Sequence, residues 1–361
     1  MNRFTSLVVG AFVAPTLAIS GGLERSELPT SFLYEDGSYL EVTYINRNYE
    51  ITDNMFAPSR SMLDDVSAVN FATKFDAGEN LSVGLARYNQ AGASHNYQGA
   101  GSPIPGFSAV GPRTDLSINA LTLMGRYAFD DFSAIGGIKI STVADATADI
   151  FKLSGATTAA SVTGGSDTGL VAGVAYDRPE IALRAELIYE AEASFSLATT
   201  GGLLGAATAN TTASVPDYRT LNFQSGIAED TLLYGSIRQA DWSNHQVAVA
   251  PQTQAAPTSD FSDSTTYTIG IGRKISDEWS VTASYKTEES SENPGTSLLS
   301  PTDGYEAIGA AAIYTLANGT EITVGLNYSM LGDKTITTSG VSGLYSDNTV
   351  VTSGIKVAYN F

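Results

Sequence analysis

Five basic residues, spread over most of the chain, fall at polar positions of segments in which polar and apolar residues alternate. They are Arg126, Lys139, Arg184, Lys286 and Lys356. Successive side chains of a β-strand point to opposite faces, so these cations lie opposite the apolar face of each strand. A cation in a medium of low dielectric can hold a carboxylate by a charge-assisted hydrogen bond. The pattern therefore predicts a site for an anionic headgroup on the polar face.

The alternative for these cations is that they pair with acidic residues of the same face. Acidic residues at compatible positions are Glu186, Glu190, Glu288 and Glu306. Charges that face the inside of a barrel commonly pair in this way, so both interpretations remain open at this point.

Two long connections rich in glycine and small polar residues carry isolated apolar residues. They are Ile104, Pro105 and Phe107 in the first connection, and Leu203 and Leu204 in the second. Exposed apolar groups on loops are typical of contact with a ligand or a lipid. Packing of one loop on another is an equal alternative.

Residues for catalysis or for binding a metal are scarce. The chain has no cysteine and only two histidines, His95 and His245, so thiolate chemistry and thiolate metal sites are excluded. The serine-containing segments GSIRQ and GGSDTG lack the strand, nucleophile and helix context of a hydrolase elbow. We expect no enzyme, no cofactor and no metal. The net charge of −19 argues against nucleic acid as a partner.

Residues 348–361 show the kind of element that positions these side chains. Val351, Ile355, Val357, Tyr359 and Phe361 share one face, and small or polar residues occupy the other. A strand between lipid and a wet interior has this pattern, with aromatic residues at the membrane interface. The same alternation is common in soluble sandwiches, so the single segment decides little.

The alternation recurs in about 14 segments, and their connections alternate between tight turns and long loops, as in outer-membrane barrels. Closure into a barrel also removes the open sheet edges that hydrocarbon does not tolerate. The sequence thus predicts an all-β fold, a transmembrane antiparallel β-barrel of about 14 strands. A soluble β-sandwich or a β-solenoid is the alternative.

The N-terminal part divides into two segments ahead of the barrel. Residues 1–20 contain Arg3, an apolar run and small residues near position 20, which indicates a secretory signal peptide. Residues 21–37 have no clear period and are expected to form a short hatch-like plug, with Glu24 and Arg25 holding it to the barrel wall. The barrel is expected to span 38–361. We expect a monomer that crosses a bacterial outer membrane many times, surrounded by lipid and lipopolysaccharide.

Several segments resemble the FadL/TodX family of outer-membrane transporters of long-chain fatty acids and other hydrophobic compounds. They are 215–243, 267–285 (YTIGIGRKISDEWSVTASY), 300–316 (SPTDGYEAIGAAAIYTL) and 322–333, and 21–44 is similar to the start of a shorter branch. The resemblance implies a barrel of 14 strands with an N-terminal hatch. It also implies capture of the ligand by outer loops and lateral release into the membrane through a gap at a kinked strand. The Asn-Pro-Ala motif of the family's longer hatch is missing here.

These observations lead to one expected function and two alternatives. The expected function is passive transport of hydrophobic molecules, long-chain fatty acids first, across an outer membrane. The first alternative is a water-filled porin for small polar solutes, and the second is a structural or adhesive barrel. Whether residues 21–36 block the lumen distinguishes the carrier from the porin.

Overall fold

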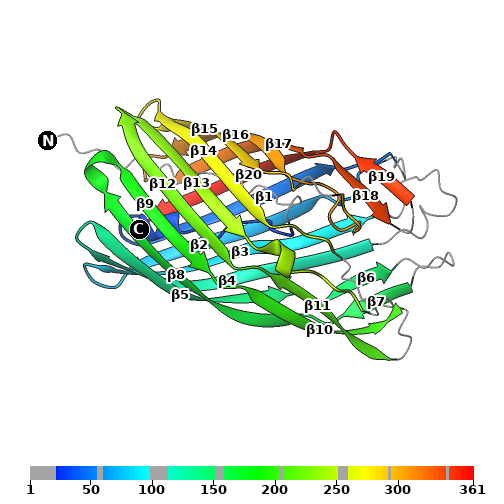
Figure 1. Cartoon of the computed structure of the whole chain (residues 1–361). Helices are drawn as coiled ribbons and strands as arrows, with labels where there is room; N and C mark the ends of the chain where they lie inside the picture. The colour runs from blue at the N-terminus through cyan, green and yellow to red at the C-terminus, as the bar shows by residue number, and fades with distance from the viewer. Residues whose placement is uncertain are drawn as a thin grey trace.

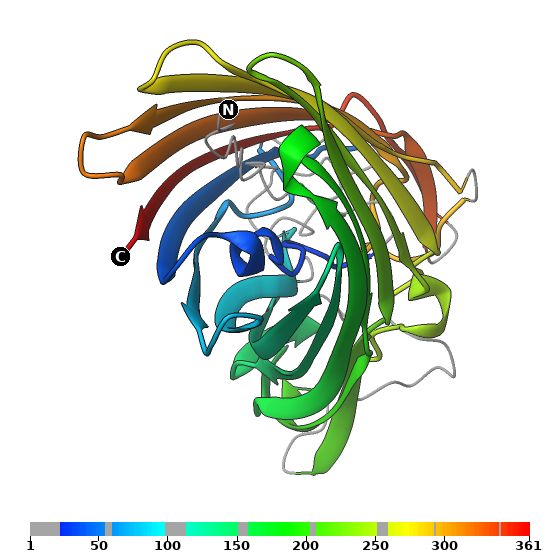
Figure 2. The same ribbon diagram turned by 90° about the vertical axis from the view of Figure 1, so that its left-hand side faces the viewer.

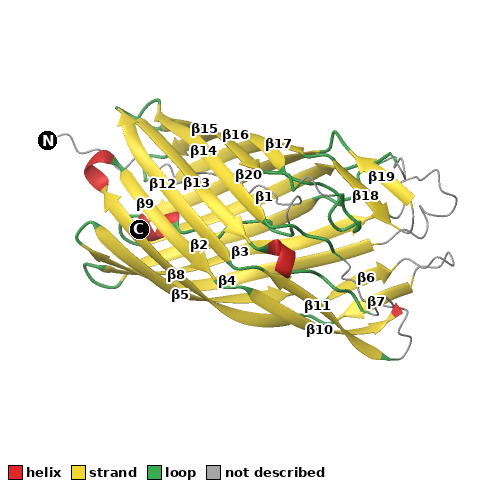
Figure 3. Cartoon of the chain, viewed as in Figure 1, coloured by secondary structure: helices red, strands yellow, loops and turns green. Residues whose placement is uncertain are grey.

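The computed structural model describes residues 22–54, 60–97, 113–150, 158–202, 207–250, 259–291, 294–338 and 341–361. Their strands form a closed antiparallel barrel whose wall has 14 strands (Figures 1 and 3). Ten wall strands are continuous: β1 (Tyr39–Glu50), β2 (Val66–Asp76), β3 (Leu81–Asn96), β4 (Arg113–Phe129), β13 (Thr231–Ala240), β14 (Ser264–Lys274), β15 (Trp279–Glu288), β16 (Tyr305–Thr315), β17 (Glu321–Leu331) and β20 (Thr349–Asn360).

Four further wall strands are each interrupted once. They consist of β5 (Phe132–Val143) with β6 (Ala146–Ile150), β7 (Thr158–Val162) with β8 (Gly165–Arg178), β9 (Leu183–Glu190) with β10 (Ala193–Gly201), and β11 (Thr208–Val215) with β12 (Tyr218–Ala228). A separate hairpin consists of β18 (Lys334–Thr338) and β19 (Val341–Tyr345). The short helical turns are η1 (Ser31–Tyr34), η2 (Pro179–Ile181) and η4 (Trp242–Asn244). None of the helices in the described ranges is long and apolar enough to cross a membrane.

The first and last strands close the barrel. Tyr39 of β1 is paired with Lys74 of β2 on one side and with Asn360 of β20 on the other. The rounded cross-section is visible in Figure 2. Every wall strand pairs with a strand on each side over at least part of its length, so the sheet closes on itself. This confirms the prediction of a closed antiparallel barrel.

The outer surface of the wall is apolar. Leu170, Val174, Ile308 and Leu326 are each 57–64% exposed, which would be unfavourable for so many large side chains in water but is expected in lipid. The last strand behaves as the sequence predicts, because Ile355, Val357 and Tyr359 are exposed while Lys356 is 8% exposed and points inward.

The two ends of the barrel differ, as the lengths of the connections predict. At one end, here called the turn end, strands are joined by tight turns, for example Asp130 and Asp131 between β4 and β5 (Figure 1, left). Asp130 has φ 49°, the left-handed conformation that such a turn requires and that aspartate tolerates. Exposed aromatic residues lie near this end, among them Phe129, Phe132 and Phe361. The opposite end, with the long connections, is called the loop end.

The interrupted strands form a four-stranded sheet, β6–β7–β10–β11, at the loop end. The inward side chains of this sheet, such as Phe195 and Leu197, belong to an apolar core that also contains Leu23, Trp242 and Phe261. The start of the described N-terminal segment is therefore fixed in this core, which lies near the loop end of the barrel.

Candidate functional site: the lumen and an interrupted wall

Residues 22–37, here called the hatch segment, lie against the inner surface of the wall. Leu23 belongs to the apolar core near the loop end, and Leu28, Phe32 and Leu33 belong to a second core lined by β3, β4 and β5. Phe32 and Leu33 are 1% and 0% exposed. The segment thus follows the lumen from the region of the loops toward the turn end, where β1 begins.

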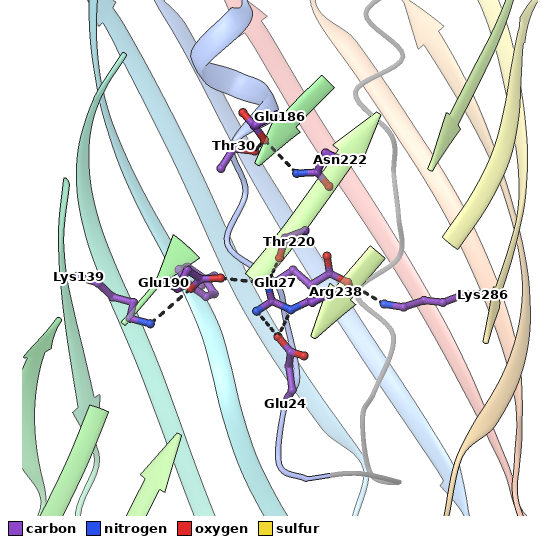
Figure 4. A network of polar contacts seen from close by, with 11 residues as sticks. Glu24, Glu27, Thr30, Lys139, Glu186, Glu190, Thr220, Asn222, Arg238 and Lys286 are labelled. Atoms are coloured by element: carbon purple, nitrogen blue, oxygen red, sulfur yellow. Dashed lines mark hydrogen bonds and ion pairs between the residues drawn. The ribbon is translucent and has the colours of Figure 1, made fainter. Parts of the chain in front are cut away.

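A chain of buried charges connects the hatch segment to both sides of the wall (Figure 4). The Arg238 guanidinium donates to Glu24 Oε1 from Nη2 at 2.6 Å and from Nε at 2.9 Å. Its Nη1 lies 3.1 Å from Glu190 Oε1, and Lys139 Nζ lies 3.4 Å from the other oxygen of Glu190. Breaking a buried pair of this kind leaves an uncompensated charge in a dry place, so the pairs restrict where the hatch segment can lie.

Further along the hatch segment, two more carboxylates tie it to the wall. Lys286 Nζ of β15 lies 2.7 Å from Glu27 Oε1. Glu186 of β9, 2% exposed, accepts hydrogen bonds from Thr30 Oγ1 at 2.5 Å and from Tyr34 Oη at 2.6 Å. The hatch segment is therefore bound by polar contacts along its whole length.

The structure places all five sequence-predicted basic residues in the lumen and engages each with a neighbour. Lys139 pairs with Glu190, Lys286 with Glu27, and Lys356 Nζ with Glu41 Oε2 at 3.4 Å. Arg126 donates to Ser133, Arg184 donates to Gln224, and both guanidinium groups lie over the Tyr34 ring. Within the described ranges, neither of these arginines has a carboxylate within ion-pair distance. A role for these five residues in binding a ligand carboxylate stays a prediction.

Sequence reasoning assigned Glu306 to the wrong face. Glu306 is exposed on the outer face of β16, opposite Thr287 and Met330 in the ladder. It is therefore unable to pair with cations in the lumen. Reasoning from the sequence also missed Arg238 and Arg47, which are 4% and 0% exposed. Strand parity would have found both, because each alternates with inward residues on its own strand.

A cavity of about 230 Å³ lies beside the hatch segment toward the turn end. The hatch segment lines it with both polar and apolar residues, among them Glu27 and Leu28. The wall contributes polar residues such as Glu41 and Arg184 and apolar residues such as Ile45. Close to this end, burial raises the pKa of Glu35 to about 7, although the charge of Lys356 opposes the shift. Glu35 itself does not line the cavity, whose walls combine polar groups with apolar residues such as Leu28 and Ile45.

The wall is interrupted between β2 and β3. Their ladder runs from the turn end to the pair Phe71 and Arg87 and stops there. It resumes in the same register near the loop end, where Leu63 and His95 form a bridge and Asp64 N donates to Ser94 O at 2.9 Å. Between these points 66–70 and 88–93 have no ladder pairing with each other, although 66–70 pair with β1 and 88–93 with β4. Asn89 N donates to Asn70 Oδ1 at 3.0 Å across this interruption, which is here called the window.

At the window, β3 pairs with the hatch segment instead of β2. Arg25 N donates to Gln90 O and Gly92 N donates to Leu23 O, both at 2.8 Å. The ladder between β3 and β4 also shifts between Asn89 and Ala91, a β-bulge that bends the strand. The bulge in β3 thus lies where the hatch segment, and not β2, bonds to the backbone of β3.

The remaining sequence-predicted residues divide into two groups. Ile104, Pro105, Phe107, Leu203 and Leu204 lie outside the described residues, as does the expected signal peptide. Of the two plug residues, Glu24 pairs with Arg238, and Arg25 Nη2 donates to Ser94 Oγ at 2.8 Å.

His245 Nε2 lies 3.5 Å from Glu192. The described part of the chain contains no group of three or more side chains that could hold a metal ion.

Gly84 of β3 provides a test of how tightly the hatch segment packs. A Cβ at this position would lie 2.5 Å from Phe32 Cε2 and 2.7 Å from Leu33 Cδ2. We expect Gly84→Val to destabilise the folded barrel by about 1–3 kcal/mol, the usual cost of overpacking a core. Urea titration followed by the heat-dependent gel shift of the folded barrel measures this. Gly136→Val, at a position with open space, is the matched control. Equal midpoints for the two variants would contradict the packing described here.

Comparison with known proteins identifies the fold. No protein-family model matches the sequence, and no match to curated proteins was found. A FadL homologue of Pseudomonas aeruginosa has a similar structure, with TM-score 0.75, 13% identity and 92% of each chain covered. The Ralstonia pickettii toluene transporter TbuX has TM-score 0.64 and 11% identity, over 93% of this chain and 92% of that one. The Pseudomonas putida toluene transporter TodX has TM-score 0.60 and 12% identity, over 91% and 90%.

Proposed function

Because the chain has the fold of FadL-type outer-membrane barrels, we propose that it transports hydrophobic molecules passively across an outer membrane. Long-chain fatty acids are the proposed substrates. The ligand is captured at the loop end, where the apolar residues at 104–107 and 203–204 are proposed to contact it. It leaves sideways through the window into the lipid. Residues 1–20 are proposed to be the signal peptide and the hatch segment to be the plug.

The observation that carries this proposal is the window beside a lumen crossed by buried charges. An acyl chain that passed Arg238, Glu190 and Lys139 would separate these buried, paired charges without offering them a hydrogen bond, which is costly. A straight path to the turn end is therefore unfavourable for an apolar tail. The window lies next to the apolar outer surface, so the sideways path ends in hydrocarbon.

The porin alternative would use the 230 Å³ cavity near the turn end, whose walls combine charged residues with apolar ones such as Ile45 and Phe71. A porin needs a continuous aqueous path, whereas the hatch segment occupies the lumen with side chains that are almost completely buried, such as Phe32 and Leu33. The observations therefore favour the carrier.

Uptake of labelled oleate tests the proposal. Cells that lack the gene are compared with the same cells carrying it on a plasmid, with folded protein in the outer membrane verified by its gel shift. We expect uptake to depend on the plasmid and conductance in planar bilayers to be small. Absence of uptake together with a large, stable conductance would contradict the carrier function and support the porin. Absence of both uptake and conductance would support a structural or adhesive barrel.

A further inference from the structure

Arg87 is a basic residue on the lipid-facing side of the wall. The outward positions of β3 from the turn end are Leu81, Val83, Leu85 and then Arg87, and the ladder places Phe71 of β2 and Leu121 of β4 directly beside Arg87. A charge on the lipid face of a barrel is destabilising unless it lies near the interface or has a partner. The position of this arginine among apolar outward residues therefore needs an explanation.

Arg87 lies at the edge of the window. It belongs to the last ladder pair before the interruption, and its Nη1 donates to the carbonyl of Val69 at 2.9 Å. That carbonyl lies within the stretch of β2 that pairs with β1 but not with β3. One bond uses one of the five N–H donors of a guanidinium. In the described ranges no carboxylate lies within ion-pair distance of Arg87.

A second arginine lies behind the same window. Arg25 of the hatch segment is 3% exposed, its Nε has no hydrogen-bond partner, and no described carboxylate lies within ion-pair distance of it. A buried guanidinium without a counter-charge is costly. The window is thus flanked by a cation on its inner side and another on its outer side, and an anionic group that passes through it has a partner at each step.

We propose that Arg87 is the exit-side docking residue for the carboxylate of an acyl ligand that leaves through the window. The guanidinium holds the carboxylate by charge-assisted hydrogen bonds, while the acyl chain lies along the apolar residues beside it, Phe71 and Leu121. This inference rests on the proposed transport function. Arg87 would favour acids over alcohols of equal chain length at the point of release.

The charge around Arg87 favours a singly charged carboxylate over a lipid phosphate. The ladder neighbours of Arg87 are the uncharged Phe71 and Leu121. The next pair toward the loop end, Asn89 and Asn119, is polar but neutral, and Asn89 Nδ2 donates to Asn119 Oδ1 at 3.4 Å. One cation among neutral donors matches one negative charge. A lipopolysaccharide phosphate, which carries more charge, would be bound better by a group of cations. The test below therefore includes lipopolysaccharide, so that binding of its phosphate instead of a carboxylate would be detected.

The test is photo-crosslinking in nanodiscs of phosphatidylcholine that contain the purified protein. Hexadecanoic acid with a diazirine near its carboxyl group is compared with the corresponding alcohol, and labelled positions are read by mass spectrometry. We expect the acid to label β2, β3 and β4 around Arg87, and Arg87→Met to lower that labelling about tenfold, the effect of losing a hydrogen bond to a charged group. The alcohol should label wild type and variant equally.

Three controls keep the result interpretable. Arg87→Gln retains a donor for the Val69 carbonyl but no charge, so recovery of acid labelling in this variant would mean that the arginine only supports the wall and would overturn the proposal. Arg219→Met removes another exposed arginine, 58% exposed and paired with Asp217, and should change nothing. Lipopolysaccharide added to the nanodiscs should leave acid labelling in place; if it abolishes labelling, the phosphate is the occupant and the carboxylate proposal is wrong.

Failure of this inference is distinguishable from failure of the transport function. Oleate uptake by wild-type cells is measured in parallel. Absence of uptake would refute the transport function, whereas uptake by the wild type together with normal acid labelling of Arg87→Met would refute the docking role alone.

Discussion

Replacing Arg238 with methionine is expected to destabilise the folded barrel by about 3–5 kcal/mol, because it removes one partner of a buried network. Arg238 binds Glu24 of the hatch segment and Glu190 of the wall, and the three residues are 4%, 7% and 1% exposed. Methionine fills much of the same volume but leaves two carboxylates near each other without their shared cation. Lys139 remains beside Glu190, so the loss falls most heavily on Glu24 and hence on the attachment of the hatch segment.

The measurement is equilibrium unfolding in urea with detergent or lipid, followed by tryptophan fluorescence. Trp242 lies in the same core as Leu23 of the hatch segment, so it reports on the end of this segment as well as on the barrel. Arg219→Met is the matched control, because its pair with Asp217 is exposed and is expected to contribute about 0–1 kcal/mol. Glu24→Gln in the Arg238→Met background should recover part of the stability. A loss no greater than that of Arg219→Met would show that the network does not hold the hatch segment.

The wall of the barrel was predictable from the sequence because it depends on local alternation. A period of two fixes which face a residue occupies, and Ile355, Val357 and Lys356 lie where this period places them. The turn at Asp130 and Asp131 was also predictable from the sequence, since two polar residues separate two alternating segments. The alternation did not place Glu306, because β16 has apolar residues on both faces: Ile308, which shares the face of Glu306, is 57% exposed, and Ile313 is 6% exposed.

The site was less predictable because its partners come from distant segments. The sequence indicates that Lys139 and Lys286 face the lumen, but not that Glu190 and Glu27 neutralise them, since this depends on the height of each residue along its strand and on the path of the hatch segment. The window is even harder to predict from the sequence. It arises because Leu23 and Arg25 take the backbone groups of β3 that β2 would otherwise use, a competition between segments that no local pattern records.

Removal of residues 22–37 is expected to change conductance and oleate uptake in opposite directions. Without the hatch segment the lumen loses the buried side chains of Phe32 and Leu33, and Arg238 and Lys286 become hydrated. We expect conductance in planar bilayers to rise on the order of tenfold, toward that of a water-filled barrel. A synthetic peptide of residues 22–37 should lower the conductance again, and a peptide of scrambled sequence is the control. Equal conductance of the shortened and full chains would show that the segment does not close the lumen.

The fall in oleate uptake follows from the same contacts. In the shortened chain Gln90 O and Gly92 N lose their partners in the hatch segment. Since 66–70 and 88–93 lie between two ladder segments of one register, these unpaired backbone groups of β3 can then bond to β2 and close the window. Unpaired backbone groups in lipid are costly enough to drive this pairing. The shortened chain should therefore conduct ions while it loses uptake of oleate, and unchanged uptake would mean that the fatty acid takes another path.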